Sequence, residues 1–285
     1  MGTDVAIRIS EFRRGKLVFP VIDSGPVDGE PVLLLHGWPQ DSRSWDAVAP
    51  LLHAAGYRTF APDLRGSVAS AAPRWRWQYR LEELAGDVAA MIEQIGRPVH
   101  LVGHDWGAAL AWAVAGSVQA GLKSMAALSI PHPGAFARAV LTSRQVVASW
   151  YMYAFQVPLL PELTLRTGVF RRILGELGQT EEHIRRDSDR VRDRAIARGG
   201  LHWYRAMLLS SPRVLTARVA VPTLQIWSSG DTAVLESGIR LTERFVDGPF
   251  RLEILPGVSH WIPEEAPGDT ARLLVEHFES AGAAR

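Results

Sequence analysis

The sequence predicts an α/β fold in which a mostly parallel central sheet is flanked by helices and interrupted by one inserted helical block. Short, continuously apolar segments alternate with segments of helical periodicity up to about residue 130. After the Pro-His-Pro-Gly segment at residues 131–134 the alternation stops, and only helical patterns run to about residue 218. The alternation resumes at residue 221. This order implies right-handed βαβ units on both sides of an insertion.

The expected elements follow from the apolar runs and the signals that end them. Strands are expected at residues 16–21, 31–36, 57–61, 99–102, 124–130, 221–227 and 250–255. Helices are expected at residues 46–55, 81–95, 106–118 and 269–280, and Gly56 and Gly96 end the first two. Residues 1–131 and 219–285 are therefore expected to form one core domain, with residues 132–218 as the helical block. The charged run at residues 181–198 in that block is interpreted as a solvated helix face.

The composition excludes several classes of protein. Of the 285 residues, 47% are hydrophobic and 21% are charged, which favours a folded chain with a large core. The 31 basic and 30 acidic side chains give a net charge of +1, too small an excess for a dedicated nucleic-acid binder. The absence of Cys excludes disulfides, thiolate metal sites and a Cys nucleophile. No apolar run reaches the ~20 residues of a membrane helix, and residues 1–10 lack an apolar signal segment, so we expect a cytoplasmic protein without a membrane partner.

The segment Gly-His-Asp-Trp-Gly at residues 103–107 lies between an expected strand and an expected helix. A Gly-x-nucleophile-x-Gly turn at such a junction is a nucleophile elbow, which presents its central residue at the carboxyl end of the sheet. The central residue here is Asp105, where a Ser is usual. A carboxylate can displace a leaving group from a saturated carbon and form an alkyl ester, whereas it is a poor nucleophile for ordinary ester or amide hydrolysis.

Two further segments supply groups that such a nucleophile needs. The segment His-Gly-Trp-Pro at residues 36–39 follows a buried strand, and the backbone N–H groups of Trp38 and Trp106 are the expected oxyanion donors. His260 follows the last strand, where the base belongs in the order nucleophile, acid, base. Asp231, just after the strand at residues 221–227, is the expected acid, with Glu236 and Asp247 as alternatives.

With these segments in place, the chain resembles an α/β-hydrolase of the epoxide hydrolase branch. The resemblance spans nearly the whole chain and rests on residues 36–39, 63–66, 103–107, 230–231 and 260. It implies an α/β-hydrolase fold in which residues 132–218 form a cap, or lid, that places two Tyr phenols over the nucleophile. Tyr151, four residues before the Phe of a Phe-Gln-x-Pro stretch, and Tyr204 match those two positions, and Tyr153 competes with Tyr151. After residues 63–66 the chain departs from the family pattern, so the rim of the site differs.

The resemblance implies a hydrolase that converts epoxides to vicinal diols through an alkyl ester on Asp105. Tyr151 and Tyr204 assist ring opening, and His260 with Asp231 activates the water that cleaves the ester. The implied partners are a small apolar epoxide and water. No metal or organic cofactor is signalled, and both a monomer and a homodimer stay open. The residues expected to line the substrate pocket are His36, Pro39, Trp150, Phe155 and Trp261.

Two alternatives use the same residues differently. A haloalkane dehalogenase shares the Asp nucleophile, and Trp106 beside it could help to hold a halide in either family. A ligand-binding protein on a hydrolase scaffold is the alternative without catalysis, because a fold does not by itself imply turnover. The Tyr pair favours the epoxide over the halide, and a complete set of nucleophile, acid and base argues against a pure binder.

Overall fold

An eight-stranded sheet forms the centre of the molecule in the computed structural model, which describes residues 7–117 and 121–283. The strand order is β1-β2-β4-β3-β5-β6-β7-β8, and every pair from β4 to β8 is parallel. The strands are β1 (Glu11–Arg14), β2 (Leu17–Ser24), β3 (Glu30–Leu35), β4 (Tyr57–Pro62), β5 (Val99–His104), β6 (Leu122–Leu128), β7 (Thr223–Ser228) and β8 (Phe250–Leu255). The mostly parallel sheet expected from the sequence is therefore confirmed.

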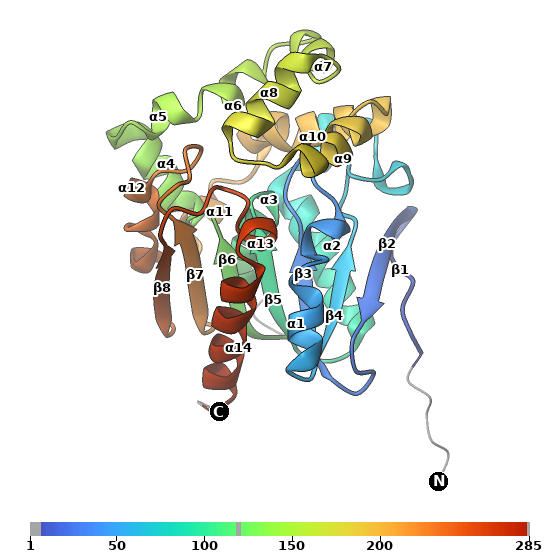
Figure 1. Ribbon diagram of the computed structural model, residues 1–285, viewed down its shortest axis with the longest axis vertical. Coiled ribbons are helices and arrows are strands. Elements are labelled where there is room, and N and C mark those ends of the chain that lie inside the picture. The colour runs from blue at the N-terminus through green and yellow to red at the C-terminus, as the bar shows by residue number, and fades with distance from the viewer. Residues whose placement is uncertain (1–6, 118–120, 284–285) are drawn as a thin grey trace.

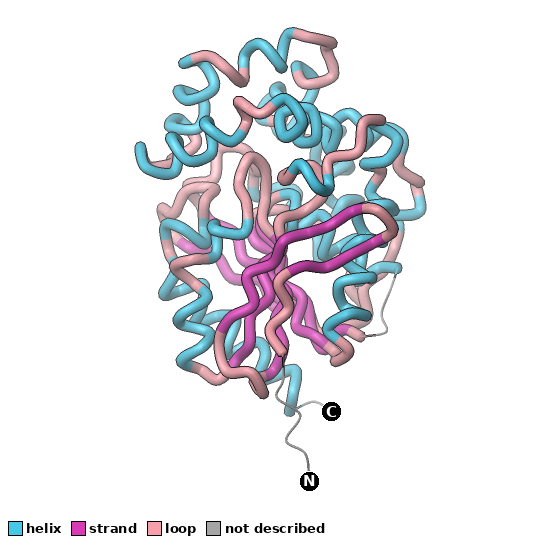
Figure 2. The backbone as a smooth tube through the Cα atoms, turned by 90° about the vertical axis from the view of Figure 1, so that its right-hand side faces the viewer, coloured by secondary structure: helices cyan, strands magenta, loops and turns pink. Residues whose placement is uncertain are grey.

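The first two strands form an antiparallel hairpin at one edge of the sheet, which faces the viewer in Figure 2. The sequence predicted β2 but not β1. Strand β1 has the sequence Glu-Phe-Arg-Arg, in which only Phe12 is buried, so it carries no apolar run. An edge strand that packs through a single side chain leaves little signal in hydrophobic periodicity.

Helices cover both faces of the sheet (Figure 1). The helices outside the insertion are α1 (Ala49–Ala54), α2 (Leu81–Ile95), α3 (Trp106–Ser117), α12 (Glu236–Ile239), α13 (Ile262–Glu265) and α14 (Pro267–Ala283). Only α2 has the predicted bounds. The expected helix at residues 46–55 is shortened to α1, which follows a 3₁₀ turn at Ser42–Trp45. The expected end of α3 at residue 118 lies outside the described residues.

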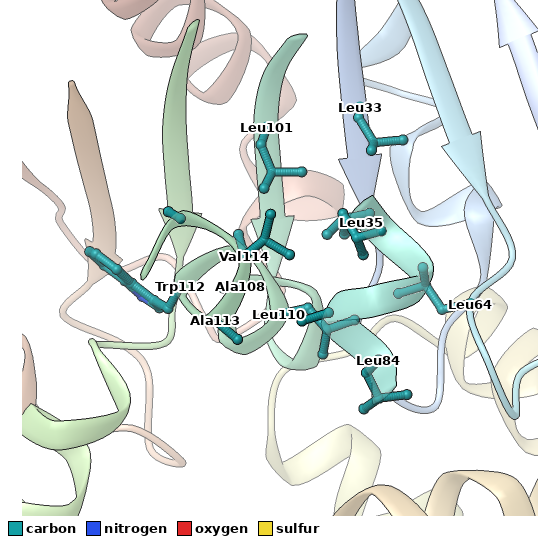
Figure 3. Packing of buried hydrophobic residues seen from close by; sticks show 14 of the residues in the cluster. Leu33, Leu35, Leu64, Leu84, Leu101, Ala108, Leu110, Trp112, Ala113 and Val114 are labelled. Atoms are coloured by element: carbon teal, nitrogen blue, oxygen red, sulfur yellow. The ribbon is translucent and has the colours of Figure 1, made fainter. Parts of the chain in front are cut away.

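Two hydrophobic clusters hold the helices to the sheet. In β3, Leu33 and Leu35 belong to the cluster under α2 and α3, while Val32 and Leu34 belong to the cluster under α1 and α14. A strand buried on both faces produces the continuous apolar run by which it was predicted. Figure 3 shows the first cluster, in which side chains of α3 interdigitate with those of the strands. Among the described residues, no helix is long and apolar enough to span a membrane.

A helical insertion between β6 and β7 lies over the end of the sheet that is remote from both termini (Figure 1). Its described residues form no strand, as the sequence pattern predicts. Its helices are α4 (Pro133–Thr142), α5 (Gln145–Ala148), α6 (Trp150–Ala154), α7 (Leu160–Thr164), α8 (Gly168–Glu176), α9 (Glu181–Arg190), α10 (Arg194–Ala206) and α11 (Arg213–Thr216). Since the insertion covers the carboxyl ends of the parallel strands, it faces the edge where such sheets carry their sites.

The charged run of the insertion is not simply a solvated face, so that interpretation is wrong for part of the run. Asp187 on α9 is fully buried, and Arg186 next to it pairs with Glu264 on α13 at 2.6 Å. Arg190 pairs with Asp41 of the core. These charges face the core, and they form ion pairs across the boundary between the insertion and the sheet domain. Periodicity alone could not separate a water-facing charged stripe from one that meets charges of another element.

Candidate active site

The turn around Asp105 has the geometry of a nucleophile elbow. It joins β5 to α3, and Asp105 has φ = 50°, in the left-handed region that side chains other than Gly rarely adopt. A Cβ at Gly103 would lie 2.1 Å from the carbonyl oxygen of Gly107, and a Cβ at Gly107 would lie 2.1 Å from the carbonyl oxygen of Leu35. The two glycines are therefore required by backbone contacts, and they allow Asp105 to sit on a sharp, strained turn.

The carboxylate of Asp105 is held by different groups on its two oxygens. Its Oδ1 accepts a hydrogen bond from the backbone N–H of Trp38 at 2.9 Å, and the backbone N–H of Trp106 also binds the carboxylate. Its Oδ2 lies 3.4 Å from Nε2 of His260. Burial raises the pKa of Asp105, but the hydrogen bond and charge of His260 outweigh burial and leave the pKa below its ordinary value. The carboxylate is therefore ionised and fixed in direction although only 8% of the residue is exposed.

His260 lies between two carboxylates. Its Nδ1 is 2.7 Å from Oδ2 of Asp231, whose other oxygen accepts the backbone N–H groups of Ala233 at 2.8 Å and Val234 at 2.9 Å. Burial lowers the pKa of His260, but Asp231 and Asp105 together outweigh that effect and raise it to about 10. In the free site the imidazole is therefore protonated at neutral pH.

The two alternatives to Asp231 have other partners. Glu236 forms an ion pair with Arg240, just after the end of α12, and Asp247 forms an ion pair with Arg218. Neither is in contact with His260, whereas Asp231 binds it directly. The acid that orients the imidazole is thus the one next to the end of β7.

Two phenols approach the elbow from the insertion. Tyr204 on α10 packs with its ring 5.0 Å from that of Trp106, and a side-chain hydrogen bond joins the two residues. Tyr151 on α6 has its ring 6.0 Å from that of Tyr204. Burial, together with the negative charge of Asp105, raises the pKa of both phenols above the ordinary value, so both keep their protons. Tyr153 is 52% exposed and has no ring contact with this group among the described residues.

Comparison with known sequences identifies the family of this chain. The profile of the family described as alpha/beta hydrolase fold matches residues 30–267. The chain belongs to the α/β-hydrolase family. Epoxide hydrolase 3 of Xenopus tropicalis is 32% identical over 271 residues, which cover 90% of this chain and 73% of the relative. An AB hydrolase superfamily protein of Bacillus subtilis is 30% identical over 91% of this chain and 94% of its own length.

Solved structures of similar proteins agree with this family assignment. An epoxide hydrolase structure from metagenomes of hot environments has a TM-score of 0.79 and 27% identity, covering 92% of this chain and 94% of the other. Epoxide hydrolase A from Mycobacterium thermoresistibile has a TM-score of 0.74 and 25% identity, covering 95% and 98%. The chain therefore falls in the epoxide hydrolase branch of the α/β-hydrolases.

Of the five residues expected to line the substrate pocket, two lie beside the site, one is largely exposed, and two are buried in the loop after β3. Phe155 lies 4.9 Å from Tyr204, and Trp261 lies 5.2 Å from His260, measured between ring centroids. Trp150 is 56% exposed, because the short helix α6 directs Tyr151 inward and Trp150 toward solvent, so its expected place in the pocket is wrong.

His36 and Pro39 are buried and hold the loop after β3 in place. His36 is fully buried, and its Nε2 accepts the backbone N–H of Leu64 at 3.0 Å. It thus ties the loop after β3 to the loop after β4. Pro39 is buried and follows Trp38 through a cis peptide bond. Both residues shape the loop that presents the N–H of Trp38.

Sequence reasoning did not assign a role to two polar residues that position His260. His104 Nε2 lies 2.9 Å, and Ser129 Oγ 3.0 Å, from the carbonyl oxygen of His260. Burial lowers the pKa of His104 to about 4, so it stays neutral and donates from Nε2. Both residues stand at the ends of strands next to the site, which is the only sequence signal that could have found them. The described residues hold no cluster of side chains suited to a metal ion.

Proposed function

We propose that this chain is an epoxide hydrolase that forms vicinal diols through a covalent ester on Asp105. The proposal is supported chiefly by the convergence of two phenols from the insertion on a carboxylate that also faces a His–Asp pair. The names of the relatives point to the same activity. In this proposal residues 132–218 act as the cap over the site, and the substrates are a small apolar epoxide and water.

Ring opening begins with attack by one oxygen of Asp105. Oδ1 accepts the backbone N–H of Trp38, so Oδ2, on the side of His260, is the oxygen that attacks an epoxide carbon. The C–O bond of the ring breaks as the new C–O bond forms, and the departing oxygen takes a proton from Tyr151 or Tyr204. The hydrogen bond from Trp106 to Tyr204 favours release of that proton, because it stabilises the phenolate.

Ester formation also prepares His260 for its role as base. In the free site, two carboxylates raise the pKa of His260 to about 10. The ester removes the charge of Asp105, so the pKa of His260 falls and the imidazole can lose its proton to the phenolate or to solvent. One reaction step thus converts a protonated imidazole into a base.

Hydrolysis of the ester completes the cycle. His260, oriented by Asp231, takes a proton from water, and the hydroxide attacks the carbonyl carbon of Asp105. The backbone N–H groups of Trp38 and Trp106 stabilise the oxyanion on Oδ1. When the intermediate collapses, the bond between that carbon and Oδ2 breaks, and the diol leaves with the proton held by His260.

A panel of epoxides and haloalkanes, assayed with the wild type and Asp105→Ala, tests this function. We expect diol from at least one epoxide, no halide release, and loss of turnover by about four orders of magnitude in the variant. Halide release without diol formation would favour a dehalogenase. Binding of the panel compounds without any turnover would favour a ligand-binding protein.

A further inference from the structure

A second site lies on the outer side of α10. A hollow of about 540 Å³ opens between this helix and the loop that leads into the 3₁₀ turn at Arg76–Tyr79. The loop directly follows residues 67–73, where the sequence departs from the family pattern. The hollow is lined by Arg74, Trp75, Arg76, Arg198 and His202.

The hollow is lined mainly by positively charged side chains. Three of its five lining residues are Arg and none is acidic. Within residues 7–117 and 121–283, the guanidinium groups of Arg74, Arg76 and Arg198 have no ion pair. Three unpaired guanidiniums around one concave surface produce a potential that attracts an anion.

Two buried nitrogen atoms at this hollow have no hydrogen-bond partner among the described residues. They are Nε of Arg198 and Nδ1 of His202. His202 uses its other nitrogen, Nε2, on the backbone carbonyl of Arg74 at 3.1 Å, which fixes the ring against the loop. Burial lowers the pKa of His202, so its ring is neutral and Nδ1, opposite the donating Nε2, is an acceptor. The unused donor at this hollow is therefore the Nε–H of Arg198, and a buried donor without a partner is costly.

An exposed aromatic surface adjoins the charge. Trp75 is 55% exposed and Trp77 is 53% exposed, and the guanidinium of Arg74 lies 5.0 Å above the ring of Trp75. Two exposed Trp rings in the alternating sequence Arg-Trp-Arg-Trp are unusual for a surface loop, because Trp is normally well buried. Of the two, Trp75 lines the hollow and provides a flat apolar platform beside the guanidiniums.

We propose that this hollow binds a small organic oxyanion, in which a phosphate or carboxylate group meets the guanidiniums of Arg74, Arg76 and Arg198 while a flat apolar body rests on Trp75. Arg suits both phosphate and carboxylate because its planar fork can donate two parallel hydrogen bonds. The site is separate from the one around Asp105.

Helix α10 separates the two sites. Trp203 and Tyr204 face Trp106 at 5.6 and 5.0 Å, whereas His202 meets Tyr79 at 5.2 Å on the other side. The helix is also held close to the loop after β4, since a Cβ at Gly199 would lie 2.5 Å from the Cα of Gly66. The wall of the hollow is thus fixed by backbone contact, so a ligand finds a preformed surface.

Calorimetric titration with four probes tests the proposal. The probes are 1-naphthyl phosphate, 1-naphthoate, neutral 1-naphthylmethanol and inorganic phosphate. The two naphthyl anions should bind at least about tenfold more tightly than either the neutral analogue or phosphate alone, because only they use both the charge and the platform. Equal affinity for 1-naphthylmethanol would overturn the proposal, as would binding of inorganic phosphate alone at millimolar concentration, which would indicate an adventitious ion only.

Variants test whether 1-naphthyl phosphate binds at this hollow. Arg198→Gln and Arg76→Gln should each weaken 1-naphthyl phosphate about tenfold or more. The matched control Arg192→Gln, on an exposed residue that pairs with Asp189, should leave affinity unchanged. Arg76 is exposed, so its variant tests the site even if Arg198→Gln does not fold. Wild-type affinity for 1-naphthyl phosphate in Arg76→Gln and Arg198→Gln would overturn the proposal, whether or not the epoxide reaction is found.

Discussion

The two sides of the active site are built by different means. On the core side, Asp105, His260 and Asp231 stand on loops at the ends of parallel strands, where backbone geometry and backbone donors fix them. On the insertion side, Tyr151 and Tyr204 stand on helices that are positioned by packing against the core. The core side therefore depends on local structure, and the insertion side depends on contacts between distant segments.

This difference implies distinct responses to mutation. In the proposed mechanism, a change to a core residue should remove a chemical step, because each group there has one role and no neighbour can replace it. A change on the insertion side should only weaken a step, because the proposed mechanism gives two phenols one task. The predictions below test that contrast, beginning with the largest expected effect.

Replacing the base should stop the reaction halfway. In His260→Gln, Asp105 and both phenols remain, so ring opening should proceed and ester hydrolysis should fall by about 10³–10⁴-fold. Rapid-mixing kinetics should show a burst equal to one epoxide consumed per active site. Steady turnover at the wild-type rate without a burst would exclude His260 as the base.

Removing the phenols should weaken ring opening in a graded way. Tyr151→Phe and Tyr204→Phe should each lower the rate of ester formation by about 10–100-fold, and the double variant should lose more than either single variant, up to about 10⁴-fold. Single-turnover kinetics measure this step. The matched control is Tyr153→Phe, which changes an exposed phenol and should react as the wild type does. A larger loss in the control than in Tyr151→Phe would reverse the choice between the two residues.

A methyl group added to α10 of the insertion should disturb the position of Trp38 on the core side of the site. A Cβ at Gly200 would lie 1.7 Å from Nε1 of Trp38, whose backbone N–H binds Asp105. Gly200→Ala should therefore displace Trp38 and lower kcat by about 10²-fold, as loss of one oxyanion donor does. In the matched control, Gly168→Ala, the added Cβ meets nothing within 4 Å, so activity should be retained. Unchanged kcat in Gly200→Ala would show that the two sides are not mechanically linked through Trp38.

The pH dependence of stability should report the charge pattern around His260. Its pKa is raised to about 10 in the folded site from an ordinary value of 6.5. The protonated imidazole thus stabilises the fold fully below pH 6.5, and this contribution is lost as the pH rises toward 10. The difference in unfolding free energy between the wild type and His260→Gln should shrink over that interval in urea titrations. A difference that does not change with pH would contradict the raised pKa.

The core side of the site could be predicted from the sequence better than the insertion side. Seven of the eight strands, the elbow around Asp105 and the contact of His260 with Asp231 were predicted because apolar runs, a Gly pair and the order of segments encode them locally. Tyr151 and Tyr204 were found only through family resemblance, since nothing in their local sequence indicates what their helices pack against. Trp150 was misplaced for that reason. The buried pair of Arg186 and Glu264 was missed because it joins residues 78 positions apart.

Isotope transfer in a single turnover tests the covalent route most directly. Excess wild-type enzyme is mixed with an epoxide in water enriched in ¹⁸O, and both the diol and the peptide that contains Asp105 are analysed by mass spectrometry. Attack by Oδ2 followed by hydrolysis at the carboxyl carbon predicts an unlabelled diol and ¹⁸O in Asp105. A diol labelled in the first turnover, with no label in Asp105, would mean that water attacks the epoxide directly and would contradict the ester.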